Sequence, residues 1–567
     1  MEALPCRFLR GDGAHYWQGD LHIPSGRDER SCAIESCAQV AHTPADGGVR
    51  PTEVSFRKVT NVSTHDNTEP HHEGRFKKVM GGADALFIGF GAMIGFGWIT
   101  LTGGWLNDAG TWGAMIAMVA GGAIMILVAL VYSELVAAMP HAGGEHNYLM
   151  RGMGPRASLL GSWAIIGGYV SVILFETVAT PRTVDYILDG IPMFEQLLPN
   201  GLSGLLPMYT VAGAQVGLVW ALIGAVCAIV ITWINIRGVK VASLVQTFVV
   251  IFIILVALML VVGGFVKGDV EHTKPFFNHG AVGFMAVLGT VPFLFVGFDV
   301  IPQAAEEIRI APKKIGRLII WSVSMAVAFY LVVIYVTSLA MPAVELLPAP
   351  GEGAKLVTGD AIAVLFGHPV WGKIVLCGGL AGILTSWIAF LMGASRLLWA
   401  MANSGMIPAW FGKLHPQYKT PSNALLFLGV LSALAPFLGT GMLTWAVDGG
   451  SPMIVLAYAL VAIAFVILRR REPEMPRPMH AGGPGFGGVV LGVLASVICV
   501  VLFLLYIPNA TPISITLDWQ SYTFFGLWML AGVLFALRLP GGVKPGVRAE
   551  SVLLAKIAAR KAGKGGK

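Results

Sequence analysis

Twelve long apolar runs are the feature that most limits what this chain can fold into. A helix that crosses a bilayer needs about 20 predominantly apolar residues. Only 12% of the 567 residues are charged, about half the usual share of a soluble protein. The sequence therefore predicts an all-α polytopic membrane protein with twelve transmembrane helices, and it excludes a soluble enzyme, a coiled coil and a disordered scaffold. The runs lie at residues 83–106, 111–138, 158–187, 211–235, 242–266, 283–304, 316–340, 371–400, 423–440, 443–468, 487–507 and 520–538.

The positions of the basic residues predict how these helices are oriented. If the N-terminus is cytoplasmic, the inner loops contain clusters of basic residues, such as those at 313–314 and 469–471. The outer loops contain far fewer: Arg182, Lys267, Lys274 and Lys355. Lys and Arg favour cytoplasmic loops. We therefore expect a multi-pass protein of the plasma (inner) membrane with both termini in the cytoplasm.

The chain divides into four parts by composition. We expect residues 1–78 to form a polar, disordered cytoplasmic extension, and residues 79–470 to form a core of ten transmembrane helices. Residues 471–540 would hold the last two helices, and residues 541–567 a basic cytoplasmic tail. The six cysteines include no CxxC pair, so neither a disulfide framework nor a zinc site is expected.

Glycine and proline interrupt the first and sixth apolar runs at matching positions of two five-helix halves. The interruptions contain Gly89, Gly91, Gly95 and Gly97 in the first run, and Gly289, Pro292 and Gly297 in the sixth. Each helical glycine costs up to about 1 kcal/mol relative to alanine. Such a pair of broken segments predicts an inverted-repeat transporter with its binding site at the breaks. The alternative is that the glycines only permit close helix packing. For the matched pair we favour the site.

Four motifs, in order along residues 80–470, resemble those of the amino acid–polyamine–organocation (APC) superfamily of transporters. The first, GAMIGFGW at 91–98, resembles GxxIGxGI, and the second, YSEL followed by PHAGGEHNY within 132–148, resembles YxEL…P.AGG..Y. The third is FVGFD with AAEE and a proline within 295–312, and the fourth is GASRLLWAMA with GMIP within 393–408. All four in register make the resemblance specific.

The resemblance implies a leucine-transporter-type fold, which has two inverted five-helix repeats and two extra helices. It also implies a permease that takes up or exchanges amino acids or related amines by alternating access. The amides of Phe96 and Gly97 would face a substrate carboxylate. The backbone carbonyls of Phe293, Leu294 and Val296 would face its ammonium, with Phe293 at the aromatic gate position. Ile94, Gly95 and Gly297 are also expected to line the substrate site. Phe96 replaces a small serine of many members, so we expect an unusual substrate.

Ionisable side chains inside the membrane are costly and indicate function. Glu176, in the middle of the third run, is a candidate for reading a cationic substrate or carrying a proton. Alternatively, Glu176 has a structural role and forms an ion pair with Arg182 or another buried cation. Asp299, just beyond the sixth-run break, would exchange protons or cap the half-helix that follows.

Further charged residues lie at the predicted cytoplasmic helix ends. Glu134, Glu306, Glu307 and Arg396 would form an inner-gate ion-pair network, or pair as ordinary surface residues. Of these we assign Glu134 and Glu306, together with Asp299, to coupling or gating.

Three hypotheses remain open for the coupling ion. Sodium-coupled members of this fold use paired hydroxyls in the eighth helix with carbonyls of the first break, which implies a site at Gly91, Ile94, Thr385 and Ser386. The alternative is that these hydroxyls bond to their own helix. Proton coupling is the second hypothesis, although Ile253 stands where many proton-coupled relatives carry a lysine. Exchange without either ion is the third. No other cofactor is expected.

Competing classes fit the sequence less well. An intramembrane enzyme would need a catalytic set, and neither HExxH nor GxSxG occurs. A channel would need a selectivity ring, usually with multimer symmetry. A transporter-like nutrient sensor has the same core and stays open. The expected partners are a small-molecule substrate and membrane lipid, with no nucleic acid. The sequence leaves the oligomeric state open.

Overall fold

Helices formed by the apolar runs make up most of the chain. The computed structural model describes residues 76, 78–189, 191–197, 201–211, 214–342, 356–508, 514, 515 and 517–564. The predicted extension, residues 1–78, therefore lies almost wholly outside the described residues. Within the described residues, eleven helical segments are long and apolar enough to cross a membrane. They comprise α2 (Gly82–Met93) with α3 (Gly97–Thr100), α4 (Thr102–Ala138), α6 (Pro155–Leu188), α9 (Leu218–Arg237), α10 (Val239–Lys267), α11 (Gly280–Phe295) with α12 (Val300–Gln303), α13 (Pro312–Ala340), α15 (Pro369–Asn403), α17 (Met442–Arg471), α18 (Phe486–Leu504) and α19 (Trp519–Arg538).

The ninth apolar run forms a shorter helix than the others. For this reason eleven segments, rather than the predicted twelve, are long enough to cross a membrane. The run forms α16 (Ser422–Leu434), which tightens into the 3₁₀-helix η5 (Ala435–Leu438). Pro436 lies in this last turn, and a proline cannot donate the amide that a continuing α-helix requires. The result is a shorter apolar helix, Ser422–Leu438.

The fourth apolar run departs from the all-α prediction at its start. We expected a helix from residue 211, but the helix α9 begins at Leu218. The preceding residues form an antiparallel hairpin of β1 (Pro207–Val211) and β2 (Ala214–Gly217), in which Tyr209 pairs with Val216. Tyr, Thr and Val favour extended backbone, and they are clustered here.

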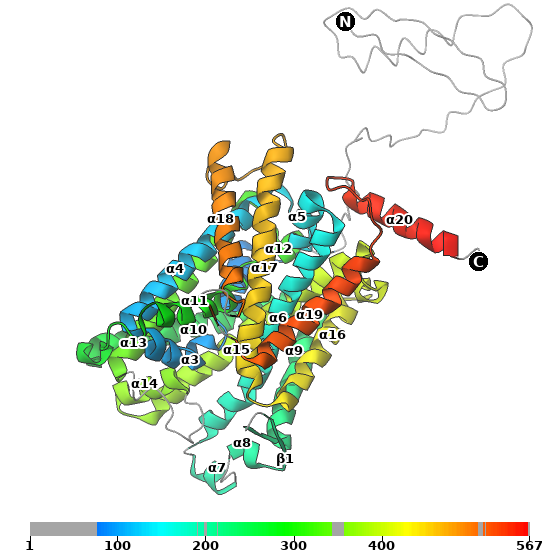
Figure 1. The fold of residues 1–567 in the computed structure, drawn as a ribbon. Helices are drawn as coiled ribbons and strands as arrows, with labels where there is room; N and C mark the ends of the chain where they lie inside the picture. The colour runs from blue at the N-terminus through cyan, green and yellow to red at the C-terminus, as the bar shows by residue number, and fades with distance from the viewer. Residues whose placement is uncertain are drawn as a thin grey trace, which may run out of the picture. The chain divides into compact units, whose positions relative to one another are not determined.

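Shorter elements lie at the two ends of the helix bundle. In Figure 1, α5 (Gly144–Met153) and α20 (Ala549–Lys564) lie at the upper end, and α7 (Pro192–Leu197), α8 (Gly201–Gly204) and β1 lie at the lower end. The remaining elements are α14 (Val357–Phe366) and the 3₁₀-helices η1 (Val270–Thr273), η2 (Ala305–Glu307) and η4 (Ala409–Gly412).

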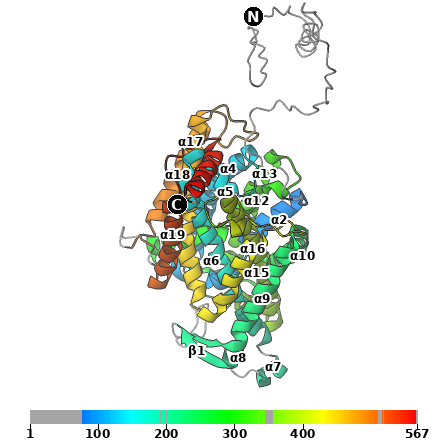
Figure 2. The same cartoon turned by 90° about the vertical axis from the view of Figure 1, so that its right-hand side faces the viewer.

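Helix α6 is the most enclosed of the long helices. It packs against α15, α17, α9 and α19. Its central place in the bundle can be followed in Figures 1 and 2. In the most apolar stretch of α6, 94% of the residues are buried inside the protein, whereas in that of α19 only 17% are buried. A polar side chain in the middle of α6 therefore faces other helices.

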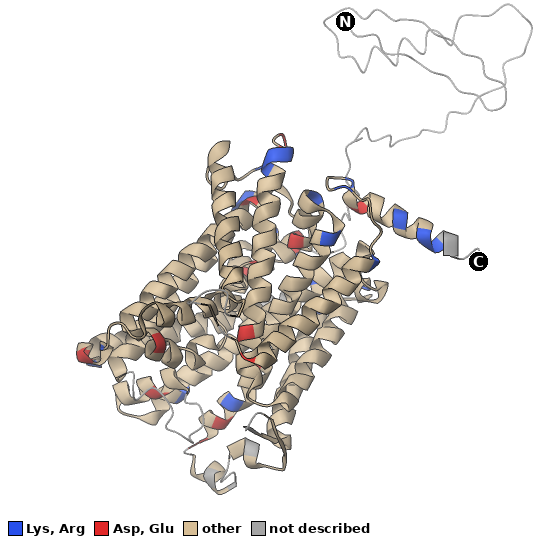
Figure 3. Ribbon diagram, viewed as in Figure 1, with Lys and Arg blue, Asp and Glu red and all other residues tan. Residues whose placement is uncertain are grey.

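The outer helices carry exposed apolar side chains. Phe248 and Leu255 on α10 are 67% and 57% exposed, and Leu527 on α19 is 65% exposed. Apolar patches of this extent are unusual on a protein that is surrounded by water. Charged residues lie mostly toward the two ends of the bundle (Figure 3). This distribution fits helices that cross an apolar layer.

Two helices are interrupted where the sequence predicts breaks. The first break, residues 94–96, separates α2 from α3. The second, residues 296–299, separates α11 from α12, and Gly297 within it has φ +130°. A side chain is strained at such a φ, so the second break requires glycine at this position.

Candidate functional site

The two breaks pack directly against each other. A Cβ added at Gly297 would lie 2.6 Å from the Ala92 Cβ atom, and one added at Gly97 would lie 2.7 Å from Leu294 Cδ2. At Gly297 the contact is with the Cβ and backbone of α2, so this approach requires glycine. The structure therefore brings together the two sets of predicted substrate residues, 94–97 and 293–297, from opposite halves of the chain.

Glu176 of α6 lies on the first break. Its Oε1 atom accepts hydrogen bonds from the Phe96 amide, at 3.3 Å, and from the Ser386 hydroxyl, at 2.6 Å. Its Oε2 atom has no hydrogen-bond partner, although the residue is only 1% exposed. The donors to this carboxylate are therefore an amide and a hydroxyl, and the alternative ion pair with Arg182 does not form.

Asp299 bonds to the second break in a similar way. The Gly297 amide, which would continue α11 by donating to the Phe293 carbonyl, donates instead to Asp299 Oδ1 at 2.8 Å. The carboxylate is fully buried, and the hydroxyls of Tyr169 and Tyr458 also interact with it. Asp299 occupies the N-cap position of α12 but accepts no amide of that helix. Asp299 was predicted either to exchange protons or to cap the half-helix α12, and the structure shows no capping hydrogen bond.

The predicted sodium ligands also lie at the first break. The Thr385 hydroxyl is 2.9 Å from the Gly91 carbonyl and 2.8 Å from that of Gly382, one turn earlier on α15. A Cβ added at Gly382 would lie 2.6 Å from the carbonyls of both Ile94 and Gly95. The four predicted ligand residues thus lie near one another. Ser386, however, contacts Glu176 through its hydroxyl.

Aromatic side chains flank both breaks. Phe96 is fully buried, and a Cβ added at Gly379 of α15 would lie 3.0 Å from its ring. Phe293 makes an edge contact with Phe175, with 5.3 Å between ring centroids. Phe293, the predicted aromatic gate residue, is 5% exposed.

The predicted gating residues lie in three separate polar groups at one end of the bundle, two of which are ion pairs with arginines. Glu134 is 1% exposed and pairs with Arg469, at 2.5 Å, and Arg477, at 3.1 Å. Glu307 pairs with Arg396 at 2.6 Å. In the third group, Glu306 accepts the Ala142 amide at 3.1 Å and lies 3.9 Å from His141 Nδ1. Sequence reasoning missed Arg469 and Arg477, because it treated them as loop charges.

Sequence reasoning also missed a buried polar cluster around Glu145. This residue of α5 is fully buried, accepts the Tyr132 hydroxyl at 2.9 Å and contacts the Gln303 amide. Burial raises the pKa of the Glu145 carboxyl well above its usual value, and the nearby charge of Asp299 raises it further. Glu145 belongs to the quoted AGGEHNY motif, but nothing in the sequence places it near Asp299.

The raised pKa of Glu145 predicts a pH dependence of stability. Below pH 4.5 both the folded protein and the unfolded chain hold the proton, so Glu145 costs no stability there. As the pH rises above 4.5, the folded protein keeps the proton that the unfolded chain loses, and Glu145 destabilises the fold. We expect the free energy of unfolding to fall by up to about 1.4 kcal/mol per pH unit in this window. Thermal unfolding of Glu145→Gln measured against pH checks this: the variant should show a flatter profile. An equally steep profile would contradict the prediction.

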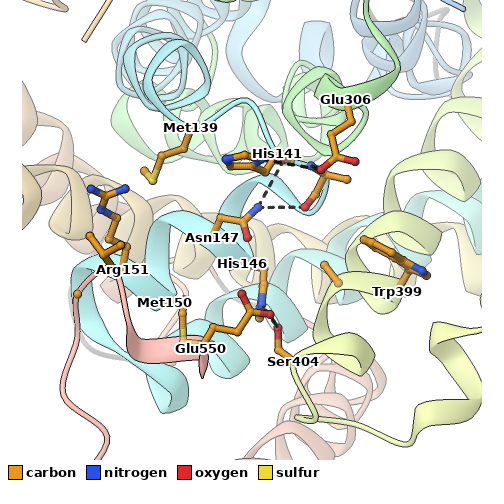
Figure 4. Close-up of a pocket in the computed structure, with 14 residues that line it drawn as sticks. Met139, His141, His146, Asn147, Met150, Arg151, Glu306, Trp399, Ser404 and Glu550 are labelled. Carbon is orange, nitrogen blue, oxygen red and sulfur yellow. Dashed lines mark hydrogen bonds and ion pairs between the residues drawn. The ribbon is translucent and has the colours of Figure 1, made fainter. Parts of the chain in front are cut away.

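A pocket of about 90 Å³ opens at the end of the bundle where α5 lies. His146, Ser404 and Glu550 line it, and Ser404 is bonded to both of the other residues (Figure 4). Of the predicted site residues, only Glu306 lines this pocket. The pocket is therefore separate from the two breaks.

Comparisons with known proteins agree with the predicted family. The model of the amino acid permease family matches residues 81–534, which is most of the chain. The methylthioribose transporter of Bacillus subtilis is 28% identical over 80% of this chain and 91% of its own length. The branched-chain amino acid permease BcaP of the same organism is 26% identical, over 82% and 93% respectively.

A third relative extends the range of transported compounds. The aspartate-proton symporter of Bacillus subtilis is 27% identical over 72% of this chain and 76% of its own length. These relatives are transporters rather than enzymes, which confirms the resemblance based on the four motifs. Together with the apolar helices, the match from residue 81 to residue 534 identifies the chain as an integral, multi-pass membrane protein of the APC superfamily, in its amino acid permease family.

Proposed function

We propose that this permease moves an amino acid or related amine by ion-coupled alternating access, with its substrate site between the two breaks. The observation that carries the proposal is the contact of the second break, at Gly297, with Ala92 in the last turn of α2, directly before the first break. Backbone groups released from helical bonding are tolerated at membrane depth where they line a site or lie buried in protein. The Phe96 amide and the Phe293 carbonyl are such groups.

Uptake of a radiolabelled panel of amino acids and amines into proteoliposomes tests this function. Saturable uptake of at least one compound supports it. Specific binding without flux would favour the alternative of a transporter-like nutrient sensor. Flux that requires a counter-substrate inside the vesicle would favour an exchanger. The relatives act on methylthioribose, branched-chain amino acids and aspartate, so the panel has to be chemically broad.

The coupling ion is sodium or a proton in this proposal. Thr385 and Gly91 support a sodium site, because hard cations prefer hydroxyl and carbonyl oxygens. The buried carboxylates Glu176 and Asp299 support proton coupling. If sodium binds, both its replacement by choline and Thr385→Val should raise the substrate KM about tenfold, since each removes ligand contacts worth at least about 1 kcal/mol.

Other results would distinguish the remaining hypotheses for coupling. Uptake that is indifferent to sodium but collapses with a protonophore would support the proton. Uptake that is indifferent to both would support exchange. The matched control Thr523→Val removes an exposed hydroxyl that bonds only within α19, so it should leave the KM unchanged.

We also propose how the membrane-spanning helices are arranged and how they are oriented in the membrane. The chain would have twelve spans, with α16 and η5 as the ninth, arranged as two inverted five-helix repeats, residues 79–470, followed by two helices, residues 471–540. The clusters of basic residues near α5, α17 and α20 support an inner membrane position with this end in the cytoplasm (Figure 3). The extension 1–78 and the tail 541–567 would then be cytoplasmic, and the exposed apolar faces would contact lipid.

A further inference from the structure

We propose that Glu176 fills the place of a substrate carboxylate at the first break, so that the transported substrate is an organic amine without a carboxylate. This inference rests on the proposed substrate site between the two breaks. It assigns the Glu176 side chain a defined position within that site and narrows the substrate to a cation.

The first argument concerns the hydrogen-bond donors of the break. In transporters with broken helices, backbone amides at the break hold the anionic group of the substrate. Here the Phe96 amide already donates to Glu176 Oε1, and the Ser386 hydroxyl lies 2.6 Å from the same atom. A substrate carboxylate would find these donors occupied, and it would lie beside a carboxylate of like charge, which is unfavourable.

The second argument concerns space. A Cβ added at Gly95 would overlap Glu176 Oε1 and would lie 3.1 Å from Ser386 Oγ. On the α15 side, Gly382 approaches the carbonyls of Ile94 and Gly95 so closely that an added Cβ would lie 2.6 Å from each. The Glu176 carboxylate thus fits closely against the break, and a second carboxylate has no room in the same place.

The third argument concerns the oxygen atom that remains. Glu176 Oε2 is buried and accepts no hydrogen bond. A buried polar atom without a partner is unfavourable, and more so when it carries charge. An ammonium group supplies three N–H donors and a compensating positive charge. The ammonium of a cationic substrate would therefore donate the hydrogen bond that Glu176 Oε2 lacks within the protein.

The second break also carries a buried carboxylate, that of Asp299. Asp299 accepts the Gly297 amide through Oδ1, and the hydroxyls of Tyr169 and Tyr458 interact with its carboxylate. Among the described residues, no Lys, Arg or His forms an ion pair with either Glu176 or Asp299. Two buried carboxylates at adjacent breaks favour a cation over a zwitterion, because the negative end of a zwitterion would lie beside carboxylates of like charge.

Uptake of matched compounds by the full-length protein in proteoliposomes tests the inference. The pairs are leucine with 3-methylbutylamine and lysine with 1,5-diaminopentane, which differ within each pair only by the carboxylate. We expect at least one amine to be transported, with kcat/KM at least about tenfold above that of its amino acid, because the carboxylate of the amino acid would lie beside Glu176, a charge of the same sign.

Two substitutions separate the charge of Glu176 from its size. Glu176→Gln keeps an oxygen for the Phe96 amide but removes the charge, so amine uptake should fall at least about tenfold. Glu176→Ala vacates the position, so the ratio of amino acid to amine uptake should rise. The matched control Glu271→Gln removes an exposed carboxylate from η1 and should leave both rates unchanged.

The possible results distinguish this inference from the function on which it rests. Preference of the wild-type protein for both amino acids would overturn the inference while the proposed function stands. This comparison needs no variant, so it holds even where Glu176 variants fail to fold. Unchanged amine uptake by Glu176→Gln, with loss of pH dependence only, would make Glu176 a proton carrier and also overturn the inference. Neither transport nor binding of any panel compound would overturn the proposed function itself.

Discussion

Replacing Gly95 by alanine is expected to lower kcat/KM for uptake about tenfold to hundredfold. The new Cβ would overlap Glu176 Oε1, and two hydrogen bonds, from Phe96 and Ser386, hold that carboxylate in place. Inserting a carbon into a well-packed site typically costs about 1–3 kcal/mol. Each 1.4 kcal/mol is about a factor of ten. Initial rates of uptake in proteoliposomes measure the effect.

Gly104→Ala is the matched control for this substitution. Gly104 lies on α4, and an added Cβ there would meet no atom within 4 Å. Uptake by this variant should equal that of the wild-type protein, and membrane expression should be retained in both. Normal uptake by Gly95→Ala would mean that Glu176 does not lie against the first break in the working transporter.

Replacing Glu134 by glutamine is expected to have the largest effect on stability. The buried carboxylate accepts hydrogen bonds from Arg469 and from the Ala481 amide, and it forms an ion pair with Arg477. Its loss leaves two guanidinium groups without their carboxylate. Removing one partner of a buried ion pair costs about 3–5 kcal/mol. The midpoint of thermal unfolding in detergent, compared with that of the wild-type protein, measures the loss.

An exposed pair provides the comparison for Glu134. Glu271 and Lys274 form an ion pair in which both side chains are more than half exposed. Such pairs contribute about 0–1 kcal/mol, so Glu271→Gln should barely change the midpoint. Equal midpoints for the two variants would show that the Glu134 cluster does not stabilise the fold.

Local composition was sufficient to predict most of the helices. The long helices follow the apolar runs within a few residues, as for α13 at Pro312–Ala340, because length and hydropathy are properties of the chain itself. Three departures depend on details of individual residues. Helix α4 begins at Thr102, before the predicted run at 111, and its backbone turns at Gly110, which has φ +72°. Pro436 tightens the end of α16, and residues 207–211 pair with residues 214–217 before α9.

The positions of both breaks were also predictable. Glycine has a high cost in a helix and a low cost at positive φ, so its clustering in the first and sixth runs indicates where the backbone departs from helix. Gly297, with φ +130°, is the clearest case. This property belongs to the residue type, so no knowledge of its neighbours is required.

The sequence alone determined the family, the apolar helices, their breaks and the presence of buried carboxylates in α6 and α11–α12. Only the tertiary structure decided what those carboxylates touch. Glu176 meets Phe96, 80 residues away, and Ser386, 210 residues away, and Glu134 meets Arg469 across 335 residues. Hydropathy and glycine content act along the chain and can be read from it. A hydrogen bond between distant residues depends on how whole helices pack, and no local pattern records that packing.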